Sequence, residues 1–144
     1  MIIYVDGDSC PVISIVKDIS NIYNLNYLVI SDYNHNLKVP KNNYIIVDSE
    51  KDEADFFIAN RIVDGDFLIT NDMGLAAMVL GKDVTVLNFT GDLIDKNNID
   101  LFLFQRHVSK MERKNNVYNT KFKKRSKTDN INFRNSLIKF LNRR

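Results

Sequence analysis

This sequence has little of what secreted, membrane-spanning and zinc-binding proteins require. Its 144 residues include one cysteine, which excludes an intrachain disulfide framework. No apolar stretch approaches the roughly 20 residues of a membrane span, and the first residues lack the basic and long apolar regions of a signal peptide. The two histidines are distant in sequence, so nothing supports a zinc site. Together these absences lead us to expect a cytoplasmic protein with no membrane contact.

The charge is unevenly distributed along the chain. The net charge is only +2, but residues 1–105 hold 7 basic and 16 acidic residues, whereas residues 106–144 hold 13 basic and 2 acidic ones. Such asymmetry indicates contact with nucleic acid or another anionic surface, although a solvated basic tail explains it equally well. A chain of this length and 44% hydrophobic content suits one globular domain. We expect an α/β core over about 1–92 and a helical, basic part over 93–144.

Short apolar runs alternate with stretches of helical periodicity. Runs at residues 2–5, 27–30, 44–47, 67–70 and 84–88 are typical of strands buried on both faces of a parallel sheet. Helical patterns lie between most of these runs, one more is expected within 93–111, and the last one includes 133–141. The pattern predicts a three-layer α/β/α fold with a central, mainly parallel sheet of about five strands.

Several residues predict where helices begin and end. Ser9 is suited to cap a helix whose first turn contains Pro11. Acids at 48–55 favour another helix start, and Gly81 is a suitable C-cap for a helix over 74–80. Residues 114–130 are polar and basic, and we expect a loop there.

Acidic residues follow two of the predicted strands directly. Asp6 and Asp8 follow the first strand, and Asp72 follows the fourth. Because ligands bind at the carboxyl ends of strands in an open parallel sheet, these side chains should share one pocket. Asp55, which shares a helix face with Asp52, should lie at the same edge.

Such a group of carboxylates needs compensation. Two carboxylates about 5 Å apart repel by roughly 3 kcal/mol at an effective dielectric near 20. A shared proton or a bound cation offsets this repulsion, and oxygen-rich sites suit Mg²⁺ or Mn²⁺. The competing interpretation is local, because Asp is common in turns, and Asp66 fits a turn better than a site. Cys10 is more simply a small buried residue than a catalytic thiol.

The motifs together resemble the bacterial YaiI/YqxD family, also called UPF0178. Residues 5–12 (VDGDSCPV) resemble its opening motif, which typically reads VDADACPV. Residues 52–58 (DEADFFI) are similar to its acidic helix motif, and residues 65–72 (GDFLITND) to its strand motif. Asn88 and Gly91 fit its NxxG pattern. The resemblance covers essentially the whole chain, although residues 123–129 lack the Gly-Pro that many members carry before the last helix.

The family is in turn similar to PIN-like domains, a superfamily rich in metal-dependent nucleases. This resemblance implies a PIN-like domain in which Asp6, Asp55 and Asp72 are catalytic. The same three acids, joined by Asp8, would hold Mg²⁺ or Mn²⁺. Asp52, Thr70 and Asn71 would support the site. Thr70 and Asn71 would orient metal-bound water or backbone groups.

The expected partner is RNA, whose phosphates basic side chains hold without regard to sequence. The first candidates for these contacts are Lys123, Lys124, Arg125 and Lys127, flanked by Tyr118 and Phe122 as possible stacking groups.

Two alternatives remain open. One is an RNA- or protein-binding domain without catalysis. The other is a phosphatase of the haloacid dehalogenase type, which places D-x-D after its first strand as Asp6-Gly7-Asp8 does here. Against the latter, Cys10 stands where that class usually has Thr or Val.

Overall fold

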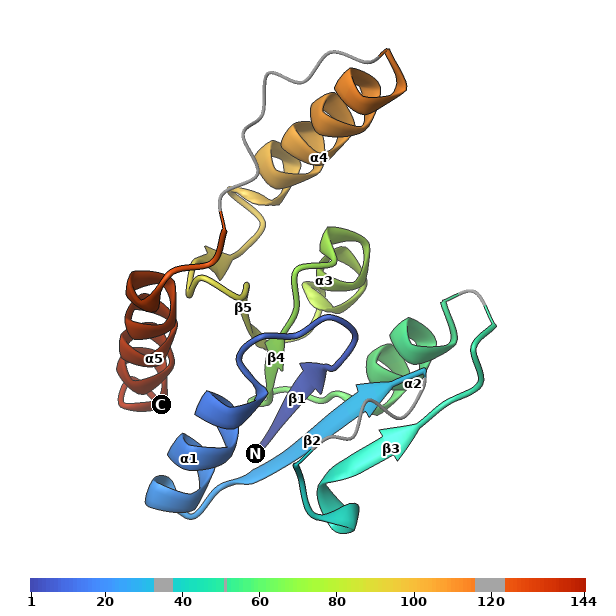
Figure 1. Cartoon of the computed structure of the whole chain (residues 1–144). Coiled ribbons are helices and arrows are strands. Elements are labelled where there is room, and N and C mark those ends of the chain that lie inside the picture. Colours follow the sequence, from blue (N-terminus) through green and yellow to red (C-terminus); the bar gives the residue numbers. More distant parts are fainter. Residues whose placement is uncertain (33–37, 51, 116–123) are drawn as a thin grey trace.

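The chain forms one six-stranded sheet with helices on both faces (Figure 1). The computed structural model describes residues 1–32, 38–50, 52–115 and 124–144. The strands lie in the order β3-β2-β1-β4-β5-β6, and the first five are parallel. Their bounds are β1 Ile2–Asp6, β2 Asn26–Ser31, β3 Tyr44–Ile46, β4 Phe67–Ile69, β5 Thr85–Leu87 and β6 Leu93–Ile94.

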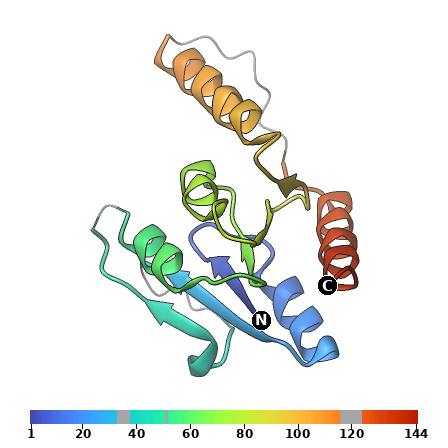
Figure 2. The same ribbon diagram turned by 180° about the vertical axis from the view of Figure 1, so that it is seen from behind.

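Five α-helices and a short 3₁₀ helix complete the described elements. The α-helices are α1 Ile13–Tyr23, α2 Glu53–Arg61, α3 Met73–Val79, α4 Ile99–Lys114 and α5 Lys127–Leu141, and the 3₁₀ helix is η1 Lys41–Asn43. Helices α1 and α5 cover one face of the sheet, and α2 and α3 cover the other (Figures 1 and 2). The predicted three-layer α/β/α architecture is therefore confirmed.

Alternate residues of the central strands build two separate cores. Ile3 and Val5 point to the side of α1 and α5, where they pack in one cluster with Phe133 of α5. Tyr4 and Leu68 belong to the second cluster, on the side of α2 and α3. Because both faces of the sheet are covered, the central strands are apolar almost throughout, which explains why they could be recognised in the sequence.

The sheet has six strands instead of about five. The additional strand, β6, has only two residues and pairs antiparallel with β5, with Val86 opposite Ile94 and Leu87 opposite Leu93. A strand of two residues has no periodicity to recognise. It carries the sheet past residue 92, where the α/β core was expected to end.

The predicted start of the first helix is wrong. Helix α1 begins at Ile13, with Val12 in the capping position and no side-chain cap. Ser9 adopts φ +56° in the loop before it and does not cap the helix. The loop is longer than expected because the chain makes a tight turn after β1, where the amide of Cys10 donates to the carbonyl of Gly7.

Two other helix ends differ from expectation. Helix α5 begins at Lys127, within the predicted loop, because Ser126 and Asp129 form a reciprocal capping box. Helix α3 ends with Leu80 as its C-cap, and Gly81 is not among the residues with positive φ. Asn24 ends α1 in the left-handed conformation, which is common at helix C-termini.

Helix α4 extends away from the sheet beyond α3 (Figures 1 and 2). Its first turn is held by Ile99, which is buried, and by Phe102, which packs partly buried against the α2–α3 core. Within the described residues, no helix combines the length and the apolar character needed to cross a membrane.

Candidate functional site

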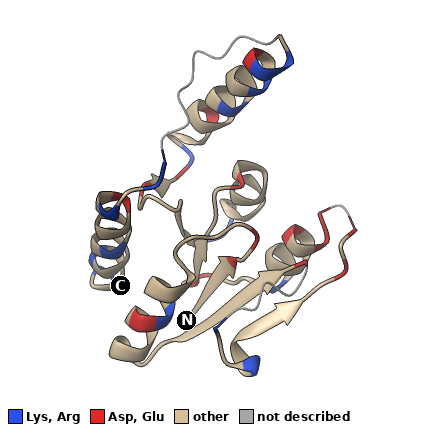
Figure 3. Cartoon of the chain, viewed as in Figure 1, with Lys and Arg blue, Asp and Glu red and all other residues tan. Residues whose placement is uncertain are grey.

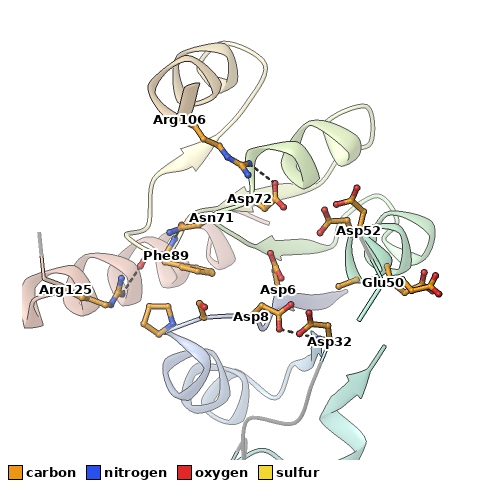
Figure 4. A pocket seen from close by; sticks show the side chains of 15 residues that line it. Asp6, Asp8, Asp32, Glu50, Asp52, Asn71, Asp72, Phe89, Arg106 and Arg125 are labelled. Carbon is orange, nitrogen blue, oxygen red and sulfur yellow. Dashed lines mark hydrogen bonds and ion pairs between the residues drawn. The ribbon is translucent and has the colours of Figure 1, made fainter. Parts of the chain in front are cut away.

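A pocket of about 610 Å³ opens where the parallel strands end (Figure 4). Asp6 ends β1, Asp32 follows β2, and Asp72 follows β4. The pocket is lined by fifteen residues: Asp6, Asp8, Ser9, Pro11, Asp32, Glu50, Asp52, Glu53, Ala54, Asp55, Asn71, Asp72, Phe89, Arg106 and Arg125. Eight of the fifteen are acidic, so the pocket is strongly anionic.

Asp6 is tied by a hydrogen bond to the strand beside it. Its Oδ2 accepts a hydrogen bond from the hydroxyl of Thr70 at 2.8 Å. Burial raises the pKa of Asp6 to about 6, against an ordinary value of 3.8, and the charges of Asp8 and Asp72 add to the rise. The Thr70 hydrogen bond opposes the shift, because it favours the ionised carboxylate.

Asp72 caps helix α3. Its Oδ1 accepts from the amides of Gly74 at 2.9 Å and Leu75 at 3.3 Å, while its own amide donates to Thr70 Oγ1 at 2.9 Å. Thr70 therefore connects the acid at the end of β1 with the acid that begins α3. This network fixes both carboxylates relative to the sheet.

Asp55 projects from the first turn of α2 toward the same pocket. Burial raises its pKa from 3.8 to about 7, with further contributions from the negative charges of Asp72, Asp6 and Asp52. The two raised pKa values have the same causes. For both Asp6 and Asp55, burial is the main cause, and the charges of neighbouring acids raise the pKa further.

Asp32 and Asp8 form a second acidic pair at the ends of β2 and β1. The amide of Asp32 donates to Asp8 Oδ1 at 3.3 Å (Figure 4). The Oδ1 atom of Asp32 is buried and has no hydrogen-bond partner in the described part of the chain. A buried carboxylate oxygen without a partner is costly, and it is a suitable ligand for a cation.

Two arginines bring positive charge to the rim. Arg106 of α4 forms an ion pair with Asp72, with 3.3 Å between Nη1 and Oδ1 (Figure 4). Arg125 donates from Nη2 to the carbonyl of Phe89 at 2.7 Å and from Nε to Asn130 Oδ1 at 2.8 Å. Asn71 Oδ1 accepts a hydrogen bond from the amide of Phe89 at 2.8 Å. This bond fixes the loop after β5 against the loop after β4.

Most of the predicted site residues meet in this pocket. Asp6, Asp8, Asp52, Asp55, Asn71, Asp72 and Arg125 line it, and Thr70 is fully buried behind Asp6. Lys124 and Lys127 are exposed and are not among the lining residues. Lys123, Tyr118 and Phe122 lie outside the described residues, so their predicted roles stay untested.

The pocket also contains residues that sequence reasoning missed. Asp6 ends β1 and Asp32 comes directly after β2, so the signal used for Asp6 was available for Asp32 too. Glu50 and Phe89 also line the pocket, but no sequence motif identifies them as site residues. Arg106 lies 34 positions from Asp72, and no sequence pattern indicates their pairing.

Asp66 lies in a turn and Cys10 is not activated as a nucleophile, as the sequence indicated. Asp66 is buried in the turn before β4, where its carboxylate accepts the amides of Ile2 at 2.9 Å and Val63 at 3.0 Å. Burial raises the pKa of Cys10 to about 12, so the thiol stays protonated near neutral pH and is a poor nucleophile.

The donor chemistry of the pocket fits a divalent cation such as Mg²⁺ or Mn²⁺, whereas its geometry is not pre-assembled. The carboxylate oxygens, including the unpartnered Oδ1 of Asp32, are the donors such a cation prefers, and neighbouring acids contribute to the raised pKa values of Asp6 and Asp55. In the described residues, however, no three Asp, Glu, His or Cys side chains already converge closely enough to hold a metal. A cation would have to draw the carboxylates together.

Comparisons with known proteins identify relatives over nearly the whole chain. The family described as "Uncharacterized BCR, YaiI/YqxD family" matches residues 4–143. A UPF0178 protein of Natranaerobius thermophilus is 37% identical over 137 residues, covering 95% of this chain and 93% of the relative. One from Lachnoclostridium phytofermentans is 34% identical over 144 residues, covering 98% and 97%. No solved structure matches the chain.

Proposed function

The chain belongs to the uncharacterised YaiI/YqxD family, and on that premise we propose that it is a divalent-metal-dependent nuclease that hydrolyses RNA phosphodiester bonds. The resemblance of the family to PIN-like domains suggests this reaction class. The proposal includes a cytoplasmic location, which the single cysteine favours over an oxidising compartment.

The observation that carries the proposal is the meeting of Asp6, Asp55 and Asp72 in one pocket. They come from β1, α2 and the start of α3. Burial and the charges of neighbouring acids raise the pKa values of Asp6 and Asp55. These three acids and Asp8 would hold Mg²⁺ or Mn²⁺. When bound, such a metal polarises a phosphoryl oxygen and lowers the pKa of a bound water.

The residues around the acids have roles that do not require the metal. Thr70 directs its hydroxyl hydrogen at Asp6 and so keeps that carboxylate in one orientation. Arg106 and Arg125 supply positive charge at the rim, where the phosphates of a substrate would approach. Figure 3 shows basic residues on α4 and α5, while acidic residues lie near α2 and the strand ends.

The test is cleavage of single-stranded RNA in the presence of Mn²⁺. We expect Asp6→Asn and Asp72→Asn each to abolish cleavage, because each removes one charged oxygen donor. Asp18→Asn, an exposed change on α1, is the matched control and should cleave like the unsubstituted chain. Equal activity in all four proteins would mean that a contaminating nuclease is responsible.

A specific observation favours a second candidate, a non-catalytic RNA-binding domain. The Arg106–Asp72 ion pair engages one of the acids, and the described acids are not pre-assembled around a metal position. RNA binding in a gel-shift assay, without cleavage under Mg²⁺ or Mn²⁺, would support this candidate. Turnover of a chromogenic phosphate ester that Asp6→Asn abolishes would point instead to a phosphatase.

A further inference from the structure

Helix α4 carries an apolar stripe that the rest of the described chain leaves open. Leu101, Phe104, Val108 and Met111 are spaced by three, four and three residues, which is the a/d spacing of a heptad. Leu101 is 57% exposed, Phe104 62% and Met111 43%, and Val108 is half-buried. We call these four residues the α4 seam. Contiguous exposed apolar surface of this kind marks an interaction site.

The seam lies on the side of α4 that faces away from the body of the protein. The body-facing side is marked by Ile99, by Phe102 and by Arg106, which reaches Asp72. At about 100° per residue, these three positions centre roughly 170° around the helix from the seam. The residues that attach α4 to the body therefore leave the seam free, and Figures 1 and 2 show this helix projecting beyond α3.

We propose that the α4 seam packs antiparallel against the α4 seam of a second copy of this chain. In that register Leu101 lies opposite Met111 of the partner subunit, and Phe104 lies opposite Val108 of the partner subunit. The ends of α4 carry opposite charge, with Asp100 in the first turn and Lys114 in the last. Asp100 therefore lies beside Lys114 of the partner subunit at both ends of the pair.

The charges also decide between the two orientations. A parallel pair would place the Arg113 and Lys114 ends of both helices together and align their dipoles, which is unfavourable. The antiparallel pair places each basic helix end beside an acidic helix start. Because the seam is complementary to itself in this way, a second copy of the chain can cover it without any other protein. This inference does not depend on the nuclease proposal.

The first test is the mass of the full chain in solution by sedimentation equilibrium. We expect a species of twice the 16.7 kDa chain mass. Phe104→Glu should weaken this association by at least about tenfold, because it places a charge in the centre of the seam. Ile131→Glu, on α5, is the matched control: Ile131 is 56% exposed, and the change should leave association unaltered. A chain that stays monomeric, or a dimer that Phe104→Glu leaves intact, would overturn the proposal.

The second test is the orientation of the pair. Variants Asp100→Cys and Lys114→Cys, mixed in equal amounts and treated with a short bis-maleimide, should cross-link with each other. The same variants alone should cross-link poorly, and the unsubstituted chain, which retains Cys10, gives the background. Circular dichroism checks that each variant is folded. Efficient Lys114→Cys self-linkage would show a parallel pair and contradict the proposed arrangement.

Discussion

Thr70 donates its hydroxyl hydrogen to Asp6, with 2.8 Å between Oγ1 and Oδ2. The same hydroxyl oxygen accepts the amide of Asp72 at 2.9 Å. One buried side chain therefore holds two acids that lie 66 positions apart in the sequence. The acidic pocket depends on this link, because Thr70 orients Asp6 and anchors the start of α3 at once.

The Thr70 link can be removed with little change in shape. In Thr70→Val the pKa of Asp6 should rise above its present value of about 6, since the hydrogen bond that favours its carboxylate is lost. We also expect a loss of about 1 kcal/mol in the free energy of unfolding. Carbon-13 NMR titration of the aspartate carboxyls measures the pKa. Thr128→Val, at an exposed position of α5, is the control, and an unchanged Asp6 pKa would refute the link.

The acids of the pocket should make stability depend on pH. Asp6 and Asp55 have folded-state pKa values raised from 3.8 to about 6 and about 7, so the folded protein retains their protons when the unfolded chain has lost them. Their contribution to the free energy of unfolding therefore falls as pH rises from about 4 to about 7. Thermal unfolding across this range measures the slope.

Asp55→Asn should reduce that slope and raise Tm near pH 7.5 by a few degrees, roughly 2–4 °C for a chain of this size. The gain comes from removing one negative charge from surroundings that disfavour it. Asp18→Asn, on the exposed side of α1, should leave the slope unchanged. If both variants keep the slope of the unsubstituted chain, Asp55 is not the group that titrates.

The Arg106–Asp72 ion pair should contribute little to stability. Its side chains are 62% and 34% exposed, and exposed pairs contribute about 0–1 kcal/mol. Under the proposed function, Arg106→Gln should nevertheless tighten Mn²⁺ binding severalfold, because the guanidinium no longer competes for Asp72. Calorimetry measures this affinity, with Lys110→Gln on the same helix as control. Unchanged or weaker binding would show that Arg106 does not compete with the metal.

At Gly91 the loop after β5 passes close to α5. It has φ +89°, and a Cβ there would lie 2.8 Å from the carbonyl oxygen of Asn132 and 2.7 Å from Ser136 Oγ. Gly65 has a similar φ of +91° but open space around its Cβ position. Gly65→Ala should cost about 1–2 kcal/mol from strain alone. Gly91→Ala should cost about 1–3 kcal/mol more, because it adds a clash. Equal losses in the free energy of unfolding for the two variants, measured in urea, would show that α5 shifts away and relieves the clash.

The sequence was most informative where burial is complete. Strands β1 and β4 are covered on both faces, so they appear as apolar runs, and the acids that follow them lie at the same sheet edge. The joining of Asp6, Asp55 and Asp72 in one pocket could therefore be predicted, because Asp6 and Asp72 lie at the carboxyl ends of parallel strands and Asp55 lies near the start of a helix at the same edge.

The features that were missed depend on contacts remote in sequence or on very short segments. Arg106 reaches Asp72 only because α4 packs on α3 in three dimensions. The two residues of β6 are recognisable only beside β5. The start of α5 was missed for another reason. The capping-box residues Ser126 and Asp129 are present in the sequence, but the basic composition of the segment led to the prediction of a loop.

The most direct test of the proposed function is calorimetric titration of the chain with Mn²⁺ near neutral pH, compared with Asp6→Asn and the control Asp18→Asn. We expect the unsubstituted chain and Asp18→Asn to bind Mn²⁺ with release of protons, since the raised pKa values of Asp6 and Asp55 leave part of their population protonated. Asp6→Asn should lose most of this binding. Absence of Mn²⁺ binding in the unsubstituted chain, or equal binding in all three proteins, would contradict a metal site at these acids.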